Sequence, residues 1–261
     1  MPAPARRTTT TRRSDVAGQL ISAADDLSRQ VDQLCFAEPI THVYNPLQYA
    51  RSLHHQYLQM ATGDCRVLFL GMNPGPWGMA QCGVPFGEVN IVRRWLGIRG
   101  EVERPPEEHP KRPIEGLHCN RSEVSGKRLW GLMEQRFGTA EAFFEHHFIV
   151  NYCPLVFMES SGRNRTPDKL PAAERDALRE HCDEHLRRVL QTLRCRHLVG
   201  VGVYAEQCLT RVAEQILARN QSPEQGFQIA RILHPSPASP AANRDWAGSA
   251  VEQLRTAGIW R

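Results

Sequence analysis

Residues 67–97 read VLFLGMNPGPWGMAQCGVPFGEVNIVRRWLG, a strand-like run that breaks into a loop and then a helix. Val67 to Leu70 are all apolar, as expected of a strand that is covered on both faces in a parallel sheet. The prolines and glycines between 74 and 78 stop the chain from continuing as a strand or a helix. Asn73 is therefore predicted to lie at the carboxyl end of the strand, the edge where open α/β sheets bind ligands. A plain strand-to-helix turn, with the asparagine chosen for its tolerance of unusual backbone angles, is the alternative.

Phe86 stands further along in the same stretch, inside Gly83-Val-Pro-Phe-Gly-Glu88. Glycine and proline on both sides keep it off the face of a regular strand or helix. We therefore expect its ring to be available to a ligand, with an ordinary place in the core as the alternative.

Three further apolar runs repeat the pattern of the first, at 148–150, 197–201 and 229–233. Helical periodicity fills the segments between them, at 128–137, 171–193 and 205–217. Strands that alternate with helices pair in parallel through right-handed crossovers. The sequence therefore predicts an α/β fold, a three-layer α/β/α domain over residues 15–261 with a central, mainly parallel four-stranded sheet.

Residues 1–14 carry four arginines, no acidic residue and almost nothing apolar. This composition predicts a disordered basic tail. A solvated tail, an arm that follows a phosphate backbone and an organelle-targeting leader remain open for it. Behind Ser14 as a helix N-cap, apolar residues at helical spacing predict a packed outer helix over residues 15–35.

The 261 residues carry a formal net charge of +4, which is compatible with a polyanionic partner. Eight cysteines are scattered without a C-x-x-C pair or a paired histidine spacing, so we expect no metal, no cofactor and reduced thiols in an intracellular protein. That compartment would be the nucleus of a eukaryote, or the cytoplasm or nucleoid of a bacterium. No apolar run approaches about 18 residues, which argues against a membrane partner. We expect a monomer.

Asn73, Asn151 and His234 each follow one of the predicted strands. Because the carboxyl ends of parallel strands meet at one edge of a sheet, these three side chains are expected to converge on one site. Taken singly, each has an ordinary explanation, since asparagine forms turns and a histidine before a proline belongs to a loop.

Four motifs in the chain resemble those of the single-strand-selective monofunctional uracil-DNA glycosylases. They are Gly71-Met-Asn-Pro-Gly-Pro-Trp-Gly-Met79 together with Gly83 to Glu88, Asn151-Tyr-Cys-Pro-Leu155, Ser161-Gly-Arg-Asn164 and His234-Pro-Ser-Pro237. The resemblance spans residues 38–246. It implies the uracil-DNA glycosylase fold and hydrolysis of the N-glycosidic bond of uracil and of 5-substituted uracils such as 5-hydroxymethyluracil. The substrate would be single- or double-stranded DNA and the product an abasic strand, which initiates base excision repair.

The resemblance also assigns roles to individual residues. Asn73 and His234 would be catalytic. The base would contact Met72, Gly75, Met79, Phe86 and Asn151. The DNA strand would contact Ser161, Arg163, Pro235, Ser236, Pro237, Ala238 and Arg244. Ala238 departs from the family, because animal relatives place there an arginine that wedges into the base stack, and Arg244 is a candidate to compensate.

Amide and imidazole side chains suit the recognition and release of a flipped pyrimidine. Asn151 can accept a hydrogen bond from uracil N3–H and donate one to O4, whereas cytosine presents the opposite pattern. A neutral His234 N–H would stabilise the negative charge that develops on O2 of the leaving base. Asn73 cannot act as a general base at neutral pH and can only orient water, which favours a dissociative reaction. The motifs hold no lysine to form a Schiff base, so no lyase activity is expected.

The sequence leaves alternatives to a uracil-DNA glycosylase: a glycine pattern typical of dinucleotide binding, and two other functions in DNA. Gly200-Val-Gly-Val-Tyr-Ala205 matches the G-x-G-x-x-[GA] pattern of dinucleotide-binding folds. His234 stands where such a fold requires an acidic residue, so these glycines are expected to allow close helix packing or to line the DNA groove. A related glycosylase acting on deaminated purines such as hypoxanthine and xanthine remains open. So does a non-catalytic binder of single-stranded or abasic DNA.

Overall fold

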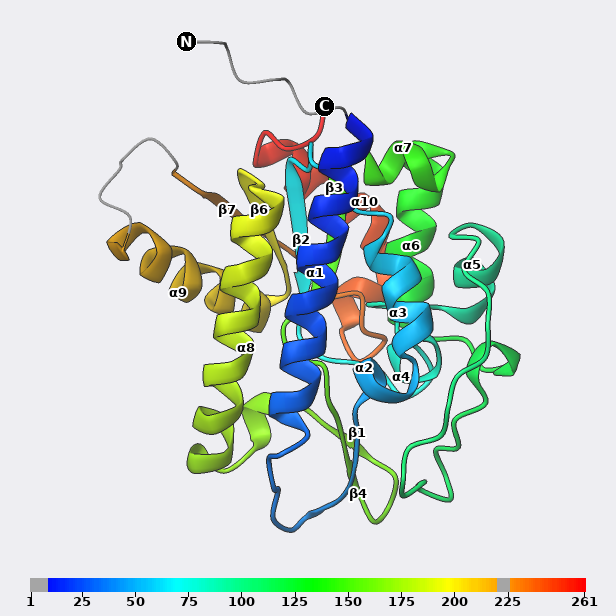
Figure 1. Ribbon diagram of the computed structural model, residues 1–261. Coiled ribbons are helices and arrows are strands. Elements are labelled where there is room, and N and C mark those ends of the chain that lie inside the picture. Colours follow the sequence, from blue (N-terminus) through cyan, green and yellow to red (C-terminus); the bar gives the residue numbers. More distant parts are fainter. Residues whose placement is uncertain (1–8, 220–225) are drawn as a thin grey trace.

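A four-stranded parallel sheet runs through the middle of the molecule (Figure 1) in the computed structural model, which describes residues 9–219 and 226–261. Its strands, in spatial order, are β3 (His147–Asn151), β2 (Val67–Gly71), β6 (His197–Val201) and β7 (Gln228–Ile232). Every neighbouring pair is parallel. All five residues of β2 and of β3 are buried. The four predicted strands are confirmed, and their ends differ from the predicted ones by one residue at most.

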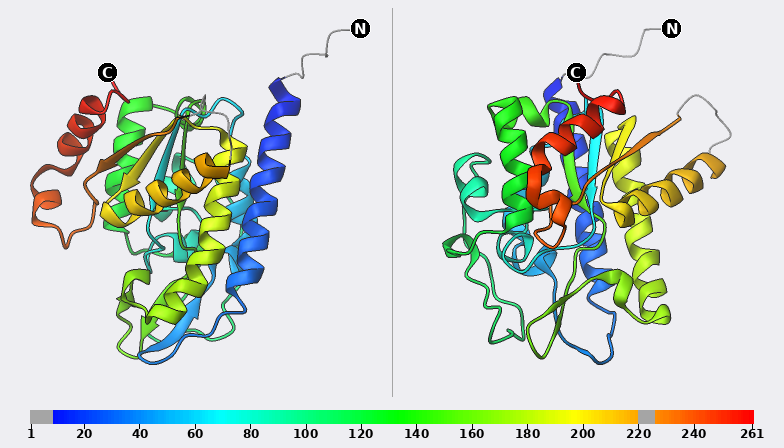
Figure 2. Two further views of the ribbon diagram at one scale, coloured as in Figure 1. Left: turned by 90° about the vertical axis from the view of Figure 1, so that its left-hand side faces the viewer. Right: turned by 180° about the vertical axis from the view of Figure 1, so that it is seen from behind.

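Helices cover both faces of this sheet. One face carries α1 (Thr9–Val31), α8 (Ala172–Leu193) and α9 (Val203–Arg219), and the other carries α6 (Val124–Phe137) and α10 (Pro240–Thr256). The left view of Figure 2 shows the sheet between these two helical layers. The predicted three-layer α/β/α architecture is therefore confirmed.

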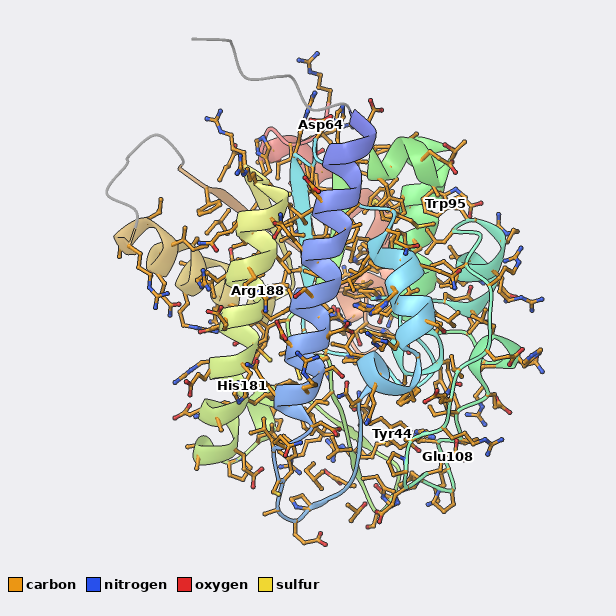
Figure 3. All side chains as sticks on the ribbon, in the orientation of Figure 1. Tyr44, Asp64, Trp95, Glu108, His181 and Arg188 are labelled. Carbon is orange, nitrogen blue, oxygen red and sulfur yellow. The ribbon has the colours of Figure 1, made fainter. Side chains whose placement is uncertain are left out.

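The first helix begins earlier than the sequence predicted. α1 starts at Thr9, so the predictions of disorder for residues 9–14 and of an N-cap at Ser14 are wrong. Residues 1–8 of the predicted basic tail lie outside the described residues. The stretch from 9 to 17 holds no glycine or proline, and a helix nucleated on its packed part extends at little cost. That part packs on α8, where the Arg188 guanidinium lies 2.6 Å from Asp26 (Figure 3).

A second, antiparallel sheet was not predicted. It consists of β1 (Ile40–Tyr44), β4 (Val156–Glu159) and β5 (Asn164–Arg165), in that spatial order. Figure 1 shows β1 and β4 at the lower end of the molecule. Tyr44, labelled in Figure 3, donates from its hydroxyl to the Arg112 carbonyl at 2.9 Å and accepts from the His109 N–H at 2.6 Å. These bonds fasten the surface excursion that follows residue 100 to the second sheet.

Short helices fill the remaining connections: α2 (Pro46–Tyr49), α3 (Arg51–Leu58), α4 (Met79–Cys82), α5 (Val89–Arg94), α7 (Ala140–Phe144), and the 3-10 turns η1 (Gly116–His118) and η2 (Pro167–Lys169). The N-cap of α5 is Glu88, whose carboxylate accepts from the Ile91 N–H at 3.1 Å. A turn in the left-handed region at Gly83, with φ of 69°, ends α4. The stretch 67–97 is thus a strand, a loop, a one-turn helix and a second short helix. No helix in the described part of the chain is long and apolar enough to span a membrane.

Candidate functional site

Gly71, the last residue of β2, forms the floor of a site at the carboxyl edge of the sheet. Its parallel neighbour in the sheet is Asn151, the last residue of β3. A methyl group added at Gly71 would overlap both Oδ1 of Asn151 and the ring of Phe86. These two side chains therefore meet directly over a residue that has none. Only glycine leaves them this space.

Asn151 presents an unused acceptor at this place. Its side chain is 8% exposed, and Nδ2 donates to the Met79 sulfur at 3.3 Å. Oδ1 is buried and receives no hydrogen bond from any residue that the structure describes. An unsatisfied buried acceptor costs about 1–3 kcal/mol, so the site is poised for a ligand that donates there.

Phe86 is held in an unusual backbone conformation. Its φ of 55° lies in the left-handed region, which costs a residue with a side chain on the order of 1–3 kcal/mol. Two contacts from α6 hold this turn. The Trp130 indole N–H donates to the Pro85 carbonyl at 3.0 Å, and Gly126 lies so close to the Phe86 carbonyl that a methyl group there would overlap it. The ring consequently faces His234, with 6.2 Å between ring centroids.

His234 is held as a neutral hydrogen-bond donor. The Ser236 N–H donates to its Nδ1 at 3.1 Å, which leaves the proton of the neutral ring on Nε2. Burial lowers the pKa of the imidazole, so the neutral form persists at neutral pH. The ring lies over Gly202 at the end of β6, where an added Cβ would be 3.3 Å from Cβ of His234. Because Gly202 has no side chain, His234, which follows the edge strand β7, can lie over the end of the neighbouring strand β6.

The other glycine of this pattern serves packing. A methyl group at Gly200 would overlap the backbone nitrogen of Glu206 in α9. The predicted close helix packing is confirmed at this position.

Asn73 lies in the loop two residues beyond β2 and is half-buried. Its Nδ2 donates to the carbonyls of Leu155 and Pro74, at 3.4 and 3.5 Å. With the amide hydrogens engaged by backbone, Oδ1 is the atom left to accept from a water molecule. No carboxylate of the described chain contacts this amide, so the pair of carbonyls alone sets its orientation.

The predicted base contacts Met72 and Gly75 belong to the same loop. The Met72 carbonyl accepts from the Cys153 N–H at 2.9 Å, which ties the loop to the segment after β3. Gly75 faces Glu123, and a methyl group at Gly75 would overlap the Glu123 carboxylate. Burial raises the pKa of that carboxyl, while the backbone N–H groups of Ser125 and Trp77 favour its charged form.

The predicted contacts to the DNA strand fall into two places, where Ser161, Arg163, Pro237, Ala238 and Arg244 are exposed, Ser236 is half-buried and Pro235 is buried. Ser161 and Arg163 lie in the turn between β4 and β5, where the Arg163 N–H donates to the Ser161 hydroxyl at 3.2 Å. Asn164, next in the chain, donates to the Pro74 carbonyl at 3.4 Å, so this turn adjoins the loop of Asn73. The second place is the loop after β7, which carries Pro235, Ser236, Pro237 and Ala238 and leads to Arg244 in α10.

Several residues of the site were not found from sequence. Gly71, Gly126 and Gly202 matter for the space they leave, and Glu123 and Arg128 act on loops far away in the chain. The sequence signals for the glycines were their position at a strand end or in a helix interior, where glycine is unfavourable, and for Gly202 also the G-x-G-x-x-[GA] pattern. Within residues 9–219 and 226–261, no group of three His, Cys, Asp or Glu side chains could hold a metal ion. All eight cysteines are free thiols.

Together these groups can bind a flat heterocycle by its edge. Asn151 supplies an acceptor and, by releasing Met79, a donor. Phe86 supplies an aromatic face, His234 a neutral N–H donor and Asn73 an acceptor for water. Such a set can stabilise negative charge on a ring oxygen without transferring a proton.

Comparison with known proteins gives a family for this chain. The family model of the uracil DNA glycosylase superfamily matches residues 59–255. The single-strand selective monofunctional uracil-DNA glycosylase of Rattus norvegicus is 50% identical over 234 residues, which are 89% of this chain and 82% of the rat protein. The proteins of the same name from Mus musculus and Bos taurus are each 49% identical over 89% of this chain, and over 81% and 84% of their own lengths.

A solved structure shares the fold. The crystal structure of wild-type Pedobacter heparinus SMUG2 superposes with a TM-score of 0.64 at 20% identity, and the match covers 93% of this chain and 98% of that one.

Proposed function

Because the chain belongs to the uracil DNA glycosylase superfamily, and within it to the single-strand selective monofunctional uracil-DNA glycosylases, we propose that it hydrolyses the N-glycosidic bond of uracil in DNA. The observation that carries this proposal is the buried, unpaired Oδ1 of Asn151 beside the Phe86 ring. The reaction would leave an abasic strand and so begin base excision repair. Single-stranded and duplex DNA are both substrates in this proposal.

Asn151 would read the base. Its Oδ1 accepts from uracil N3–H, and Nδ2 exchanges the weak acceptor Met79 sulfur for uracil O4. Cytosine has an acceptor at N3 and a donor at position 4, so it would leave buried groups unpaired on both sides, at about 1–3 kcal/mol each. The Phe86 ring covers the face of a base that has been turned out of the stack.

His234 would stabilise the leaving group. When the bond to C1′ breaks, negative charge collects on the uracil ring and is shared by O2. The Nε2–H of the neutral imidazole donates to that oxygen and keeps its proton, since Nδ1 is engaged with the Ser236 N–H. A preorganised donor of this kind lowers the barrier without acting as a general acid.

Asn73 would place the water. An amide is no base at neutral pH, so the sugar must develop oxocarbenium character before water adds to C1′. The chain has three lysines, 111, 127 and 169, and none is among the residues that meet over Gly71. Without an amine at C1′ no Schiff base forms, and the strand stays intact.

We also propose that uracils with a small substituent at C5 are accepted. Met79, which contacts the Asn151 amide, is a flexible residue that adapts to the shape of its neighbours. Gly75 does not add space for the substituent, because Glu123 fills its side-chain position. Release of 5-hydroxymethyluracil at a rate comparable to uracil is the expected outcome.

Base release under single-turnover conditions tests the proposal. Oligonucleotides that differ only in one base, uracil, 5-hydroxymethyluracil, cytosine, hypoxanthine or xanthine, are incubated with excess protein, and strand breaks are counted before and after alkali. We expect release of uracil, with breaks only after alkali. Asn151→Asp and His234→Leu should each lower the rate about a hundredfold or more. Wild-type rates in both variants would refute the assignment of these residues, and binding of uracil DNA without release would refute catalysis.

A further inference from the structure

The first half of α6 contacts each of the three loops that form the site. At its start, Glu123 packs on Gly75 and on Gly78, where an added Cβ would lie 2.9 Å from Glu123 Cγ. One turn later, Gly126 lies against the backbone of Phe86. Arg128 follows and reaches the loop after β7. One rigid helix therefore sets the relative positions of segments that are far apart in the sequence.

Arg128 bridges the two ends of the segment 234–243, which consists of the loop after β7 and the first turn of α10 and is called the 234–243 loop below. Its Nη1 donates to the Pro235 carbonyl and its Nη2 to the Asn243 side-chain oxygen, each at 2.9 Å. Asn243 in turn donates from Nδ2 to the Pro237 carbonyl at 2.8 Å. The planar guanidinium thus joins the first residue after His234 to the last residue of the loop.

The charge of Arg128 is committed to this loop. No carboxylate in the described part of the chain pairs with its guanidinium, whereas Arg94 on the same side of the molecule pairs with Glu134 of α6. Hydrogen bonds from a charged donor to neutral oxygens are stronger than those between neutral groups. The side chain is half-buried, and its bond to the Pro235 carbonyl is partly shielded from solvent, whereas its bond to Asn243 is exposed.

The loop that Arg128 holds has little else to stiffen it from outside. Within it, the Ser236 hydroxyl accepts from the Ala238 N–H at 3.2 Å, and the Ser236 carbonyl accepts from the Ser239 N–H at 3.0 Å. Pro237 and Ala238 at its tip are exposed and short. With no long side chain at the tip, the backbone itself must keep its shape if it is to occupy space between stacked bases.

We propose that Arg128 is a positioning residue that clamps the 234–243 loop through Pro235 and Asn243, so that the loop can fill the gap a base leaves in a duplex. This inference rests on the proposed glycosylase function. In a duplex the vacated position must be held open against re-entry of the base, whereas a single strand requires no such opening. The clamp should therefore matter more for duplex DNA than for single-stranded DNA.

Single-turnover uracil release from matched single-stranded and duplex oligonucleotides tests the clamp. Arg128→Gln should lower the duplex rate about tenfold to a hundredfold and the single-strand rate by about threefold or less. Arg128→Lys, which can keep one of the two bonds, should fall between Arg128→Gln and the wild type. Lys127→Gln removes the neighbouring exposed charge and is the matched control, with the ratio of the two rates unchanged. Equal losses in Arg128→Gln and Lys127→Gln would show a general charge effect and overturn the clamp.

A second measurement does not depend on activity. Hydrogen exchange at the backbone amides of Ser236, Ala238 and Ser239 reports the order of the loop. Arg128→Gln and Asn243→Ala should each speed exchange there, and the double variant should be faster still, because Asn243→Ala also removes the bond to the Pro237 carbonyl. Unchanged exchange in Arg128→Gln would overturn the clamp even if activity fell. If the wild type released no uracil while exchange changed as expected, the glycosylase proposal would fail and the clamp would stand as a structural device.

Discussion

The backbone N–H of Ser236 donates to Nδ1 of His234 at 3.1 Å, and this bond settles where the imidazole carries its proton. The acceptor role of Nδ1 places the hydrogen of the neutral ring on Nε2. If Nδ1 were protonated, its N–H would point at the Ser236 N–H, and neither donor would have an acceptor. Burial of the ring acts in the same direction, because it disfavours the charged form and lowers the pKa of His234.

The pH dependence of activity follows from that arrangement. The ordinary histidine pKa is about 6.5, and the pKa of His234 lies below it, so the neutral donor is present at pH 7 and above. We expect kcat/KM to be flat from pH 7 upward and to fall on acidification with an apparent pKa under 6.5. Nitrogen NMR of the ring should show the Nε2–H tautomer at pH 7. A rate that rises as the pH falls from 7 to 6 would mean that the charged imidazolium is the active form.

Gly71→Ala should disable the site without unfolding the protein. The added methyl group would overlap Asn151 Oδ1 and the Phe86 ring, and a displacement of about 1 Å at such groups costs about a hundredfold in rate. The measurement is single-turnover uracil release, with the melting temperature as a check on folding.

Gly131→Ala is the matched control for that substitution. Gly131 lies in α6 with no atom within 4 Å of an added Cβ. Alanine is the better helix former by about 1 kcal/mol, so activity should be unchanged and stability equal or higher. Full activity in Gly71→Ala would contradict the claim that Asn151 and Phe86 need the space that Gly71 leaves.

Asn73→Asp should not improve the enzyme, although it introduces a possible base. The new carboxylate would face the carbonyls of Leu155 and Pro74, which now accept from the amide. Repulsion from these oxygens would raise the pKa of the new carboxyl and turn it away. We expect uracil release about tenfold or more below wild type at pH 7. A faster variant would show that water activation, rather than departure of the base, limits the rate.

Glu123→Gln should raise the melting temperature at pH 7. Burial raises the pKa of the Glu123 carboxyl, so the folded state binds its proton more tightly than the unfolded state does. The cost of the charge is then absent below the unfolded pKa and grows as pH rises through the folded pKa. The gain from the neutral amide should accordingly appear at pH 7 and vanish near pH 4. In a domain of this size about 2–4 °C corresponds to each kcal/mol.

Glu134→Gln, on the same helix, should behave with the opposite sign. The hydrogen bond from Arg94 lowers the pKa of Glu134, so its charge stabilises the folded state above the unfolded pKa. The variant should melt lower than wild type at pH 7, and the difference should shrink as the pH falls toward the lowered pKa of Glu134. Thermal unfolding of both variants from pH 4 to 8 measures this. Parallel curves for the two would contradict the opposite environments of these carboxyls.

The central sheet could be predicted from sequence because three of its four strands, β2, β3 and β6, are buried almost throughout. Such strands are continuous apolar runs, as at 67–70, and the helices between them fix a parallel order. The second sheet was missed since β1 pairs with β4 across more than a hundred residues, and β4 and β5 are only four and two residues long. The helical start at Thr9 was missed because composition alone does not show how far a helix continues beyond the part that is packed on the protein.

Polar candidates for the site could be named from the sequence because the chemistry of asparagine and histidine side chains does not depend on the fold. Asparagine and histidine at strand ends offer donors and acceptors wherever the chain places them. The roles of Gly71, Arg128 and Asn243 depend on tertiary distance, to which one sequence gives no access. A positive φ at Phe86 was likewise invisible, since glycine is the usual sign of that conformation and here it is absent.

Gly71 and Asn151 are register partners in the parallel pair β2–β3: Gly71 leaves space, and Asn151 is the residue that we propose reads the base. A slip of one place between these strands would turn the amide to the opposite face while every site residue kept its identity. In our proposal, the choice of base therefore depends on the register between β2 and β3. A mutation in the hydrophobic core, far from any bound nucleotide, can therefore alter which base is released if it shifts the register of β2 and β3.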